Sequence, residues 1–325
     1  MPISVTGSIA TDHLMNYPGR FTDSLLPDQL ERVSLSFLVD NLLVNRGGVA
    51  GNIAFGMGVL GLGPVLVDAV GADFDEYAGW LVRHGVNCDH LLRCDDVQTA
   101  RFVCTTDSEM NQIGSFYSGA MSRSSQIDLQ QVADAVGGAE LVMIGAGDPD
   151  GMIKHTQKCR DNGYVFAADP SQQLAFMEGP QVLQLIDGAE YLFTNDYEFG
   201  LLRSKTGLTD EQILQKVHYR ITTHGAKGVE IVSAADGVVS VSVVPETGKV
   251  DPTGVGDAFR SGFLSGRSKG LSLPASARLG ALLATLVLET QGTQEHRFDI
   301  DEAKQRLTGA YGANSSTEIA DAFCW

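Results

Sequence analysis

The stretch from Asp251 to Phe263 carries the residues whose types and spacing best suit catalysis. It reads Asp-Pro-Thr-Gly-Val-Gly-Asp-Ala-Phe-Arg-Ser-Gly-Phe, and a strand-like run (Val238–Val244) precedes it. Glycines before a helix let the backbone approach an anion, and the free amides of the first turn point at that anion. The carboxylate of Asp257 would repel a phosphate, so phosphate binding alone does not explain an acidic residue at this position. A base that removes a proton from an attacking hydroxyl does explain it. Local chemistry leaves a second interpretation open, in which Asp257 only caps the helix and the glycines only form a tight turn.

The elements that must position this stretch follow an alternating pattern. Short β-branched runs alternate with helical segments, which is typical of a parallel sheet with helices on both faces. We therefore predict one α/β domain over residues 1–325, with three α/β/α layers and a mainly parallel central sheet. The expected strands are Val65–Val70, Leu141–Ile144, Val165–Ala168, Tyr191–Phe193 and Val229–Val232, and the expected helices are Ala50–Leu60, Phe74–His84, Gln130–Val136, Pro149–Arg160 and Thr209–Val217.

Two regions interrupt the alternation, and we predict that they form a small β-strand lid. Thr11–Asn45 is rich in loop residues, and Ala100–Thr105 and Ile113–Tyr117 are strand-like runs around a polar turn. Neither region has a helix of its own, so their strands should pair outside the main sheet. We place the lid at residues 12–46 and 97–119. Exposed lid strands often pair with a second subunit, so we expect a homodimer through the lid.

The composition narrows the class of partner. The formal net charge of −17 argues against nucleic acid and anionic membranes as partners, because both would repel the chain. The first residues lack a basic leader and an apolar signal core, and the apolar run Leu279–Leu288 is too short to span a bilayer. Five scattered cysteines predict free thiols. We expect a cytoplasmic protein.

Two further patterns in the sequence carry no function, and one common kinase motif is absent. Gly56–Gly61 fits the dinucleotide G-x-G-x-x-G string, but it lies late in a helix and precedes a strand. No G-x-x-x-x-G-K-[ST] string occurs, which argues against a P-loop kinase. The second pattern is a group of histidines and cysteines that straddles a helix end and a following strand, so its side chains should not converge on a metal: His84, Cys88, His90 and Cys94.

The catalytic stretch is similar to the D-[TP]-x-G-x-G-D-[STA]-F signature of the ribokinase-like (PfkB) kinases of sugars and nucleosides. The family's G-G-x-x-x-N element resembles Gly47–Asn52, its N-x-x-E element resembles Asn195–Glu198, and its T-x-G-x-x-G loop resembles Thr223–Gly228. Four elements in the right order cover nearly the full length. The resemblance implies a ribokinase-like fold and ATP-dependent phosphorylation of a hydroxyl with Mg²⁺.

The resemblance also implies roles for individual residues. Asp257 is the expected base, and the amides around Gly254 and Gly256 hold the developing charge. The sugar is expected to bind Ser8, Asp12, Gly48 and Asn52, with the Asp12 carboxylate on a ribose diol at the end of the first strand. The nucleotide is expected at Asn195, Thr223, Gly225, Gly228 and Gly256. Glu198 would organise Mg²⁺ through water, although Asn195 and Glu198 also fit a helix capping box. Asp251 is the candidate ligand for K⁺.

Within the family, the chain resembles the adenosine kinases of mycobacteria and related actinobacteria. The residues that carry this are Thr6–His13, Asp169–Leu174, Leu192–Glu198 and Asp251–Phe259. Phe102 and Phe116 would sandwich a purine, and Gln172 and Gln173 would bind its nitrogens. Alternatively, both phenylalanines belong to the core of the lid. We expect phosphorylation of adenosine to AMP in purine salvage. The alternatives are a ribose, inosine or guanosine kinase, or an inactive ligand sensor on the same fold; the presence of Asp257, Gly254 and Gly256 argues against the sensor.

Overall fold

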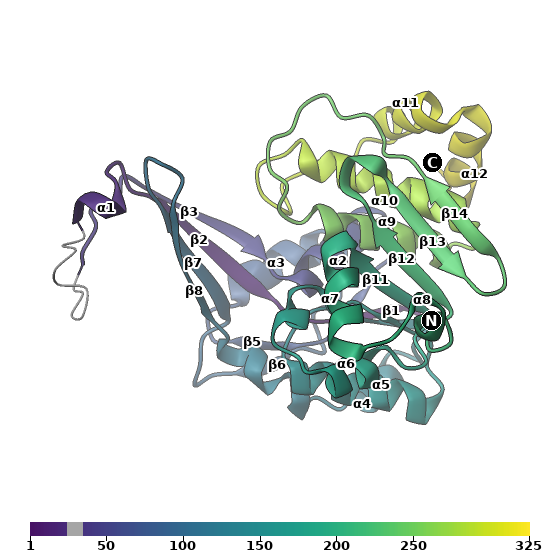
Figure 1. The fold of residues 1–325 in the computed structure, drawn as a ribbon, viewed down its shortest axis with the longest axis horizontal. Helices are drawn as coiled ribbons and strands as arrows, with labels where there is room; N and C mark the ends of the chain where they lie inside the picture. The colour runs from purple at the N-terminus through teal and green to yellow at the C-terminus, as the bar shows by residue number, and fades with distance from the viewer. Residues whose placement is uncertain (25–34) are drawn as a thin grey trace.

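The computed structural model describes residues 1–24 and 35–325, and in these residues the main sheet has eight strands (Figure 1). In spatial order the strands are β14 (Gly237–Val241), β13 (Val229–Ser233), β12 (Tyr219–Thr223), β11 (Tyr191–Asn195), β10 (Phe166–Ala168), β9 (Leu141–Ile144), β1 (Ile3–Thr6) and β4 (Val65–Leu66). In this order the six strands from β12 to β4 are parallel to one another. β13 pairs antiparallel with β12, and β14 pairs antiparallel with β13.

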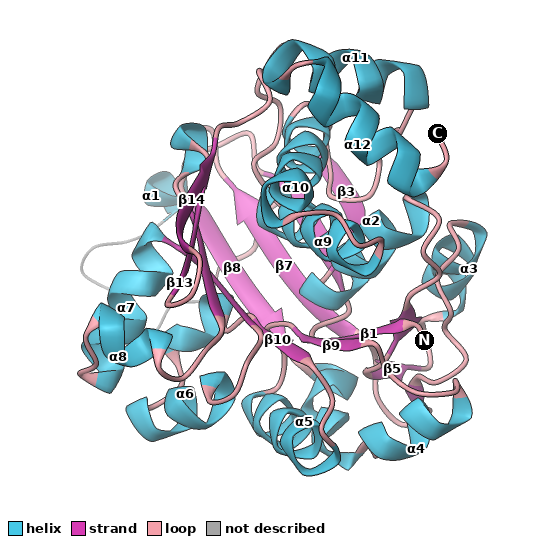
Figure 2. Cartoon of the chain, turned by 90° about the vertical axis from the view of Figure 1, so that its right-hand side faces the viewer, coloured by secondary structure: helices cyan, strands magenta, loops and turns pink. Residues whose placement is uncertain are grey.

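Helices cover both faces of this sheet (Figure 2). One hydrophobic core lies under α2 (Val49–Val59), α3 (Asp75–Arg83) and α9 (Val255–Ser268), and α10 (Leu273–Leu288), α11 (Ile300–Tyr311) and α12 (Ala313–Phe323) pack outside them. The other core lies under α4 (Leu129–Ala135), α5 (Pro149–Asn162), α6 (Gly179–Ile186), α7 (Asp196–Thr206) and α8 (Asp210–Leu214). The predicted three-layer α/β fold with a mainly parallel sheet is confirmed. Since both faces are covered, β9 is buried along its whole length.

The predicted strand Val65–Val70 is wrong in one respect, because it is two strands. β4 ends at Leu66, and β5 (Ala69–Gly71) pairs with β6 (Leu92–Cys94) in a separate small sheet. Asp68 causes the break. Its buried carboxylate accepts hydrogen bonds from the Gly7 amide at 3.0 Å and the Ala69 amide at 2.6 Å, which turns the chain out of the main sheet.

Two other predicted elements are shorter than expected, and one strand was missed. α8 covers only Asp210–Leu214, and β14 ends at Val241. β12 was missed because it carries Arg220, which is buried by pairing with Asp210 and Glu230, so the run lacks apolar character.

A second sheet, which we call the lid sheet, projects from the body of the molecule (Figure 1). Its order is β3 (Asn41–Gly47), β2 (Ala10–Asn16), β7 (Ala100–Thr106) and β8 (Gln112–Tyr117). β2 pairs antiparallel with β3 and parallel with β7. The predicted lid ranges contain most of these strands. The expectation that neither region has a helix is wrong in one place, because the short helix α1 (Phe21–Ser24) lies between β2 and β3. Residues 25–34 of the predicted lid lie outside the described residues.

Within the part of the chain that the structure describes, no helix is long and apolar enough to cross a bilayer. The same residues contain no group of three or more His, Cys, Asp or Glu side chains placed to hold a metal ion. All five cysteines are free thiols.

Candidate active site

A cavity of about 500 Å³ opens where the parallel strands end, below the lid sheet. It brings together most of the side chains that the sequence singled out: Ser8, Asp12, Gly48, Asn52, Phe102, Phe116, Gln172, Gln173, Asn195, Glu198, Thr223, Gly254, Gly256 and Asp257. Gly225 and Gly228 line a neighbouring cavity instead, and Asp251 lines neither.

Asp257 lies in the first turn of α9, with its carboxylate toward the cavity. Gly254 holds the N-cap position in the left-handed conformation (φ 76°), so the alternative that Asp257 is the N-cap is wrong. The Asp257 carboxylate instead accepts a hydrogen bond from Asn52 Nδ2 at 2.9 Å. Burial raises the pKa of Asp257, and both the Arg260 guanidinium and the Asn52 hydrogen bond oppose that rise. The arrangement provides a carboxylate beside free helix amides, which suits proton removal next to a bound anion.

The Gly47–Gly48 pair brings the start of α2 against the end of β1. Gly48 has φ 87°, and a Cβ there would lie 2.5 Å from the Ser8 carbonyl oxygen. Ser8 Oγ accepts a hydrogen bond from the Val49 amide at 3.0 Å, so Ser8 anchors the first turn of α2 as well as lining the cavity. Packing against the end of β1 therefore requires glycine at position 48.

Asp12 lies within the predicted lid range 12–46 and lines the cavity, but it is not placed directly at the end of the first strand. It belongs to the lid strand β2, because the chain forms a second strand immediately after the short loop at Gly7–Ile9. The register of the lid sheet places Asp12 beside Phe102, and Phe102 beside Phe116. Burial and the nearby Asp251 carboxylate raise the pKa of Asp12 to about 6. The row Asp12–Phe102–Phe116 sets a carboxylate next to two aromatic rings on one face of the lid sheet.

Phe116 is 54% exposed, so it does not belong to the core of the lid. Gln172 and Gln173 face the same cavity from a 3₁₀ turn (Ser171–Ala175) that follows β10. The cavity therefore offers exposed aromatic surface together with amide groups, a combination suited to a flat heterocycle with polar edges.

Asn195 and Glu198 form the capping box at the start of α7. Asn195 Oδ1 accepts from the Glu198 amide, Glu198 Oε2 accepts from the Asn195 amide, and both distances are 2.8 Å. Glu198 Oε1 remains for the cavity and lies 3.5 Å from Ser171 Oγ. The capping interpretation is thus correct, and it leaves one carboxylate oxygen available to a ligand.

A second cavity, of about 330 Å³, adjoins the first and shares Thr223 and Gly256 with it. Valines line much of this cavity, as do Phe259, Ala281 and Leu288. Gly228 (φ 96°) lies so close to the carbonyl of Val241 that any side chain there would collide. The pair of cavities can hold one polar and one largely apolar ligand that meet at Gly256.

Sequence reasoning gave no role to Asp169 and Arg260, which form a buried ion pair at this site. Arg260 Nη2 donates to Asp169 Oδ1 at 2.7 Å, and Nε lies 2.6 Å from Oδ2. Asp169 and Arg260 both lie in motif stretches that the sequence had already drawn attention to. Their opposite charges could have suggested that they pair. Thr293 and Gln294 were also missed, and the segment that contains them carries no motif.

A carboxylate beside free helix amides, at the junction of a polar and an apolar cavity, suits phosphoryl transfer to a hydroxyl group. The chain is accordingly a kinase that acts on an alcohol. Residues 6–299 match the model of the pfkB family carbohydrate kinases, and the chain belongs to this family.

Several relatives of known activity cover nearly the whole chain. A nucleoside kinase of Methanothermobacter thermautotrophicus is 31% identical over 88% of this chain and 92% of its own. The solved structure of the Burkholderia thailandensis nucleoside kinase with inosine has a TM-score of 0.82 and 32% identity, over 95% of this chain and 98% of that one. The structure of the same enzyme with ADP–inosine has a TM-score of 0.81 and 33% identity, over 95% and 96% of the two chains.

The comparisons support the family more strongly than the finer resemblance to adenosine kinases. The adenosine kinase of Saccharomyces cerevisiae is 26% identical over 87% of this chain and 91% of its own, below the identities of the nucleoside kinases. The choice of substrate therefore depends on the geometry of the cavity.

Proposed function

We propose that this kinase transfers the γ-phosphoryl group of ATP to the 5′-hydroxyl of a purine nucleoside. Adenosine, converted to AMP in purine salvage, is the predicted substrate, and inosine is the second candidate. The observation that carries the proposal is the row Asp12–Phe102–Phe116 above the cavity that contains Asp257. A sugar kinase can use the carboxylate, which accepts hydroxyl hydrogens, but has no need of two aromatic rings that line the cavity beside it.

Inosine is retained for two reasons. The related Burkholderia thailandensis enzyme was solved with inosine bound. In addition, Gln172 and Gln173 each carry both a donor and an acceptor, so a rotated side-chain amide can bind the amino group of adenine or the carbonyl of hypoxanthine.

The proposed reaction is a direct in-line displacement. Asp257 accepts the proton of the 5′-hydroxyl as its oxygen attacks the γ-phosphorus, and the bond to the β–γ bridging oxygen breaks to release ADP. The amides of Gly254, Val255 and Gly256 would hold the charge on the transferring group. The apolar cavity lined by Gly225, Gly228 and their neighbours would take the adenine of ATP, since it meets the polar cavity at Gly256. The related enzyme with ADP–inosine supports a nucleotide donor.

For Mg²⁺ the residues fit a water-mediated site. Glu198 has one oxygen committed to its capping box and one facing the cavity, and Mg²⁺ favours one or two carboxylates with phosphate oxygens and waters. Bound there through its waters, Mg²⁺ would neutralise charge on the phosphates of ATP.

The arrangement at Asp251 does not fit K⁺, and we derive no step through that ion. Asp251 Oδ1 accepts from the Thr253 amide at 2.9 Å, and Oδ2 accepts from Gln291 Nε2 at 2.9 Å and the Gly292 amide at 3.1 Å. Three N–H donors thus surround the Asp251 carboxylate, and these hydrogen bonds hold the loop before α9 in place. These contacts give no support to Asp251 as a K⁺ ligand, and a comparison of activity in K⁺ and in Na⁺ tests the K⁺ requirement itself.

We also propose a homodimer through the lid sheet in the cytoplasm. Leu42, Val44 and Ile113 on the lid strands are 56%, 51% and 49% exposed. Apolar side chains on the strands of a small projecting sheet are typical of a surface that a second copy covers. Five free thiols fit a reducing compartment.

One panel tests the proposed substrate. Thermal unfolding and turnover with ATP are measured for adenosine, inosine, guanosine and ribose, because a ligand that binds the native state raises its stability. Adenosine or inosine should raise the unfolding temperature most and should have the highest kcat/KM. A clear preference for free ribose would overturn the proposed role of Phe102 and Phe116.

A further inference from the structure

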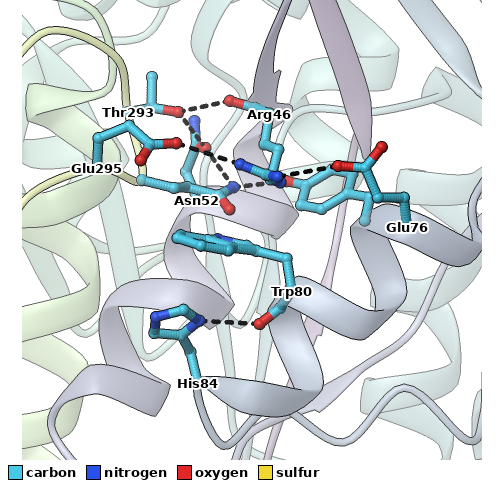
Figure 3. Close-up of polar contacts among 9 residues, drawn as sticks. Arg46, Asn52, Glu76, Trp80, His84, Thr293 and Glu295 are labelled. Atoms are coloured by element: carbon cyan, nitrogen blue, oxygen red, sulfur yellow. Dashed lines mark hydrogen bonds and ion pairs between the residues drawn. The ribbon is translucent and has the colours of Figure 1, made fainter.

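Behind the catalytic carboxylate, a short segment between α10 and α11 contacts α2, α3 and the end of β3. Thr293 and Gln294 are 5% and 1% exposed. The Thr293 hydroxyl lies 2.9 Å from the carbonyl oxygen of Arg46 and 2.8 Å from Asn52 Oδ1, as Figure 3 shows. Gln294 Nε2 donates to the same Asn52 oxygen at 2.9 Å. Thr293 has a single hydroxyl proton for these two oxygens, so the orientation of the Asn52 amide depends on the N–H group of Gln294.

The carbonyl of Gly47 fixes the direction of the hydrogen bonds that run from Tyr77 through Gln294 to Asn52. Tyr77 donates its only hydroxyl proton to the Gly47 carbonyl at 2.8 Å, so it can only accept from Gln294. Gln294 must therefore present its Nε2 group, which has no acceptor capacity, to both Tyr77 Oη and Asn52 Oδ1. With Oδ1 so engaged, Asn52 must turn Nδ2 toward Asp257, at 2.9 Å.

We infer that Tyr77 and Gln294 are positioning residues, which hold the Asn52 amide so that its N–H group, and not its carbonyl, faces Asp257. The chain of hydrogen bonds starts at Gly47, the last residue of the lid strand β3, and ends on the proposed base. Gly51 leaves room for it, because a Cβ there would collide with Tyr77 Oη. The inference rests on the proposed role of Asp257 as base.

The hydrogen bonds from Gly47 to Asp257 prevent the opposite orientation of the Asn52 side-chain amide. An Asn52 carbonyl facing Asp257 would oppose the ionised carboxylate and favour its protonated form, which cannot accept the substrate proton. Burial already raises the pKa of Asp257. Burial also raises the pKa of Tyr77, which keeps the hydroxyl proton on which the direction of the chain depends.

The test uses Tyr77→Phe and Gln294→Met, which remove the polar contacts and introduce no charge. Each is made in the wild-type protein and in an Asn52→Ala background, and kcat, KM and the pH profile are measured with the best substrate of the panel. Tyr219→Phe is the matched control, since it removes a tyrosine hydroxyl that donates to the surface residue Asp236 at 2.9 Å. Thermal unfolding shows whether each variant is folded.

We expect both variants to lose about tenfold in kcat, the effect of one hydrogen bond to a charged group, with KM for ATP unchanged. The acid limb of the profile should move to higher pH. Arg260, Glu198 and Asp169 are the charged side chains that act on Asp257 among the described residues, and none of them is altered. In the Asn52→Ala background neither substitution should lower kcat further, because both act through Asn52.

A wild-type kcat and pH profile in folded Tyr77→Phe and Gln294→Met would overturn the inference, as would an undiminished loss in the Asn52→Ala background. Failure of the proposed function is distinguishable. If the wild-type protein phosphorylates a sugar and no nucleoside, the same comparison with that sugar still tests the positioning role.

Discussion

Arg260 and Asp169, 91 residues apart in the chain, form a two-point ion pair at the cavity that contains Asp257. The Asp169 side chain has no exposed surface, and Arg260 lies three residues after Asp257, on the same side of α9. A Cβ on Gly256 would lie 2.5 Å from Arg260 Nη1. Glycine at position 256 therefore leaves room for the guanidinium of Arg260. The positive charge so held opposes the effect of burial on the pKa of Asp257.

Asp169→Asn should strongly destabilise the fold, because it leaves the Arg260 charge buried without its partner. Breaking a buried pair in this way costs about 3–5 kcal/mol in the free energy of unfolding, measured by urea denaturation. The matched control is Asp96→Asn, which breaks the two-point pair of Asp96 with Arg123 at the surface (2.6 and 2.7 Å) and should change stability little. Equal losses in the two variants would show that burial of the Asp169–Arg260 pair has no special effect.

Removing either ring of the lid should weaken binding of the purine without affecting the sugar. Phe102→Ala and Phe116→Ala should each raise KM for the nucleoside on the order of tenfold, the size of one stacking contact. Turnover of ribose, if measurable, should stay the same. Val103→Ala is the control, because Val103 is next to Phe102 on β7 and side chains alternate between the faces of a strand. An unchanged KM for the nucleoside in both phenylalanine variants would contradict stacking of the purine on Phe102 and Phe116.

Binding of the nucleoside should weaken below about pH 6. Burial and the Asp251 carboxylate raise the pKa of Asp12 to about 6, so the ionised form that accepts two hydroxyls is lost as the pH falls through that value. KM for the nucleoside should therefore rise between pH 7 and pH 5. In Asp12→Asn, KM should be high throughout and should lose this dependence. A wild-type KM that does not vary over this range would contradict the role of Asp12.

The lid dimer is tested by mass. Light scattering at micromolar concentration should give twice the mass of the 34.7 kDa chain, and Val44→Lys should give a monomer by placing a charge in the apolar surface. Thermal unfolding of the wild-type protein and of Val44→Lys serves as the control for folding. A monomeric wild-type protein would disprove the dimer.

The layers of the fold and the centre of the site follow from local rules, which is why the sequence predicts them. Gly254 and Asp257 are separated by three positions, so a helix beginning after the glycine must place the carboxylate in its first turn. The capping box of Asn195 and Glu198 is local in the same sense. Covered parallel strands produce apolar runs that can be recognised directly.

What the sequence does not predict depends on long-range contacts. Asp68 ends β4 because its carboxylate finds the amide of Gly7, 61 residues away. Arg220 is a buried strand residue only because Asp210 and Glu230 reach it. The predicted lid range includes Asp12, but the position of Asp12 beside Phe102 follows from the pairing of β2 with β7. Gln294 gains its importance from Tyr77 and Asn52, more than 200 residues earlier. No spacing rule connects these residues.

The central claim is that Asp257 is the base that activates the 5′-hydroxyl of a nucleoside. Its most direct test is to incubate wild-type protein and Asp257→Asn with ATP and adenosine or inosine and to quantify the products. The wild-type protein should form equal amounts of ADP and nucleoside 5′-monophosphate. Asp257→Asn should remain folded and form product about 10²–10⁴ times more slowly, as expected when a general base is removed. Near-normal turnover by Asp257→Asn, or phosphate on any position other than the 5′-hydroxyl, would contradict the account.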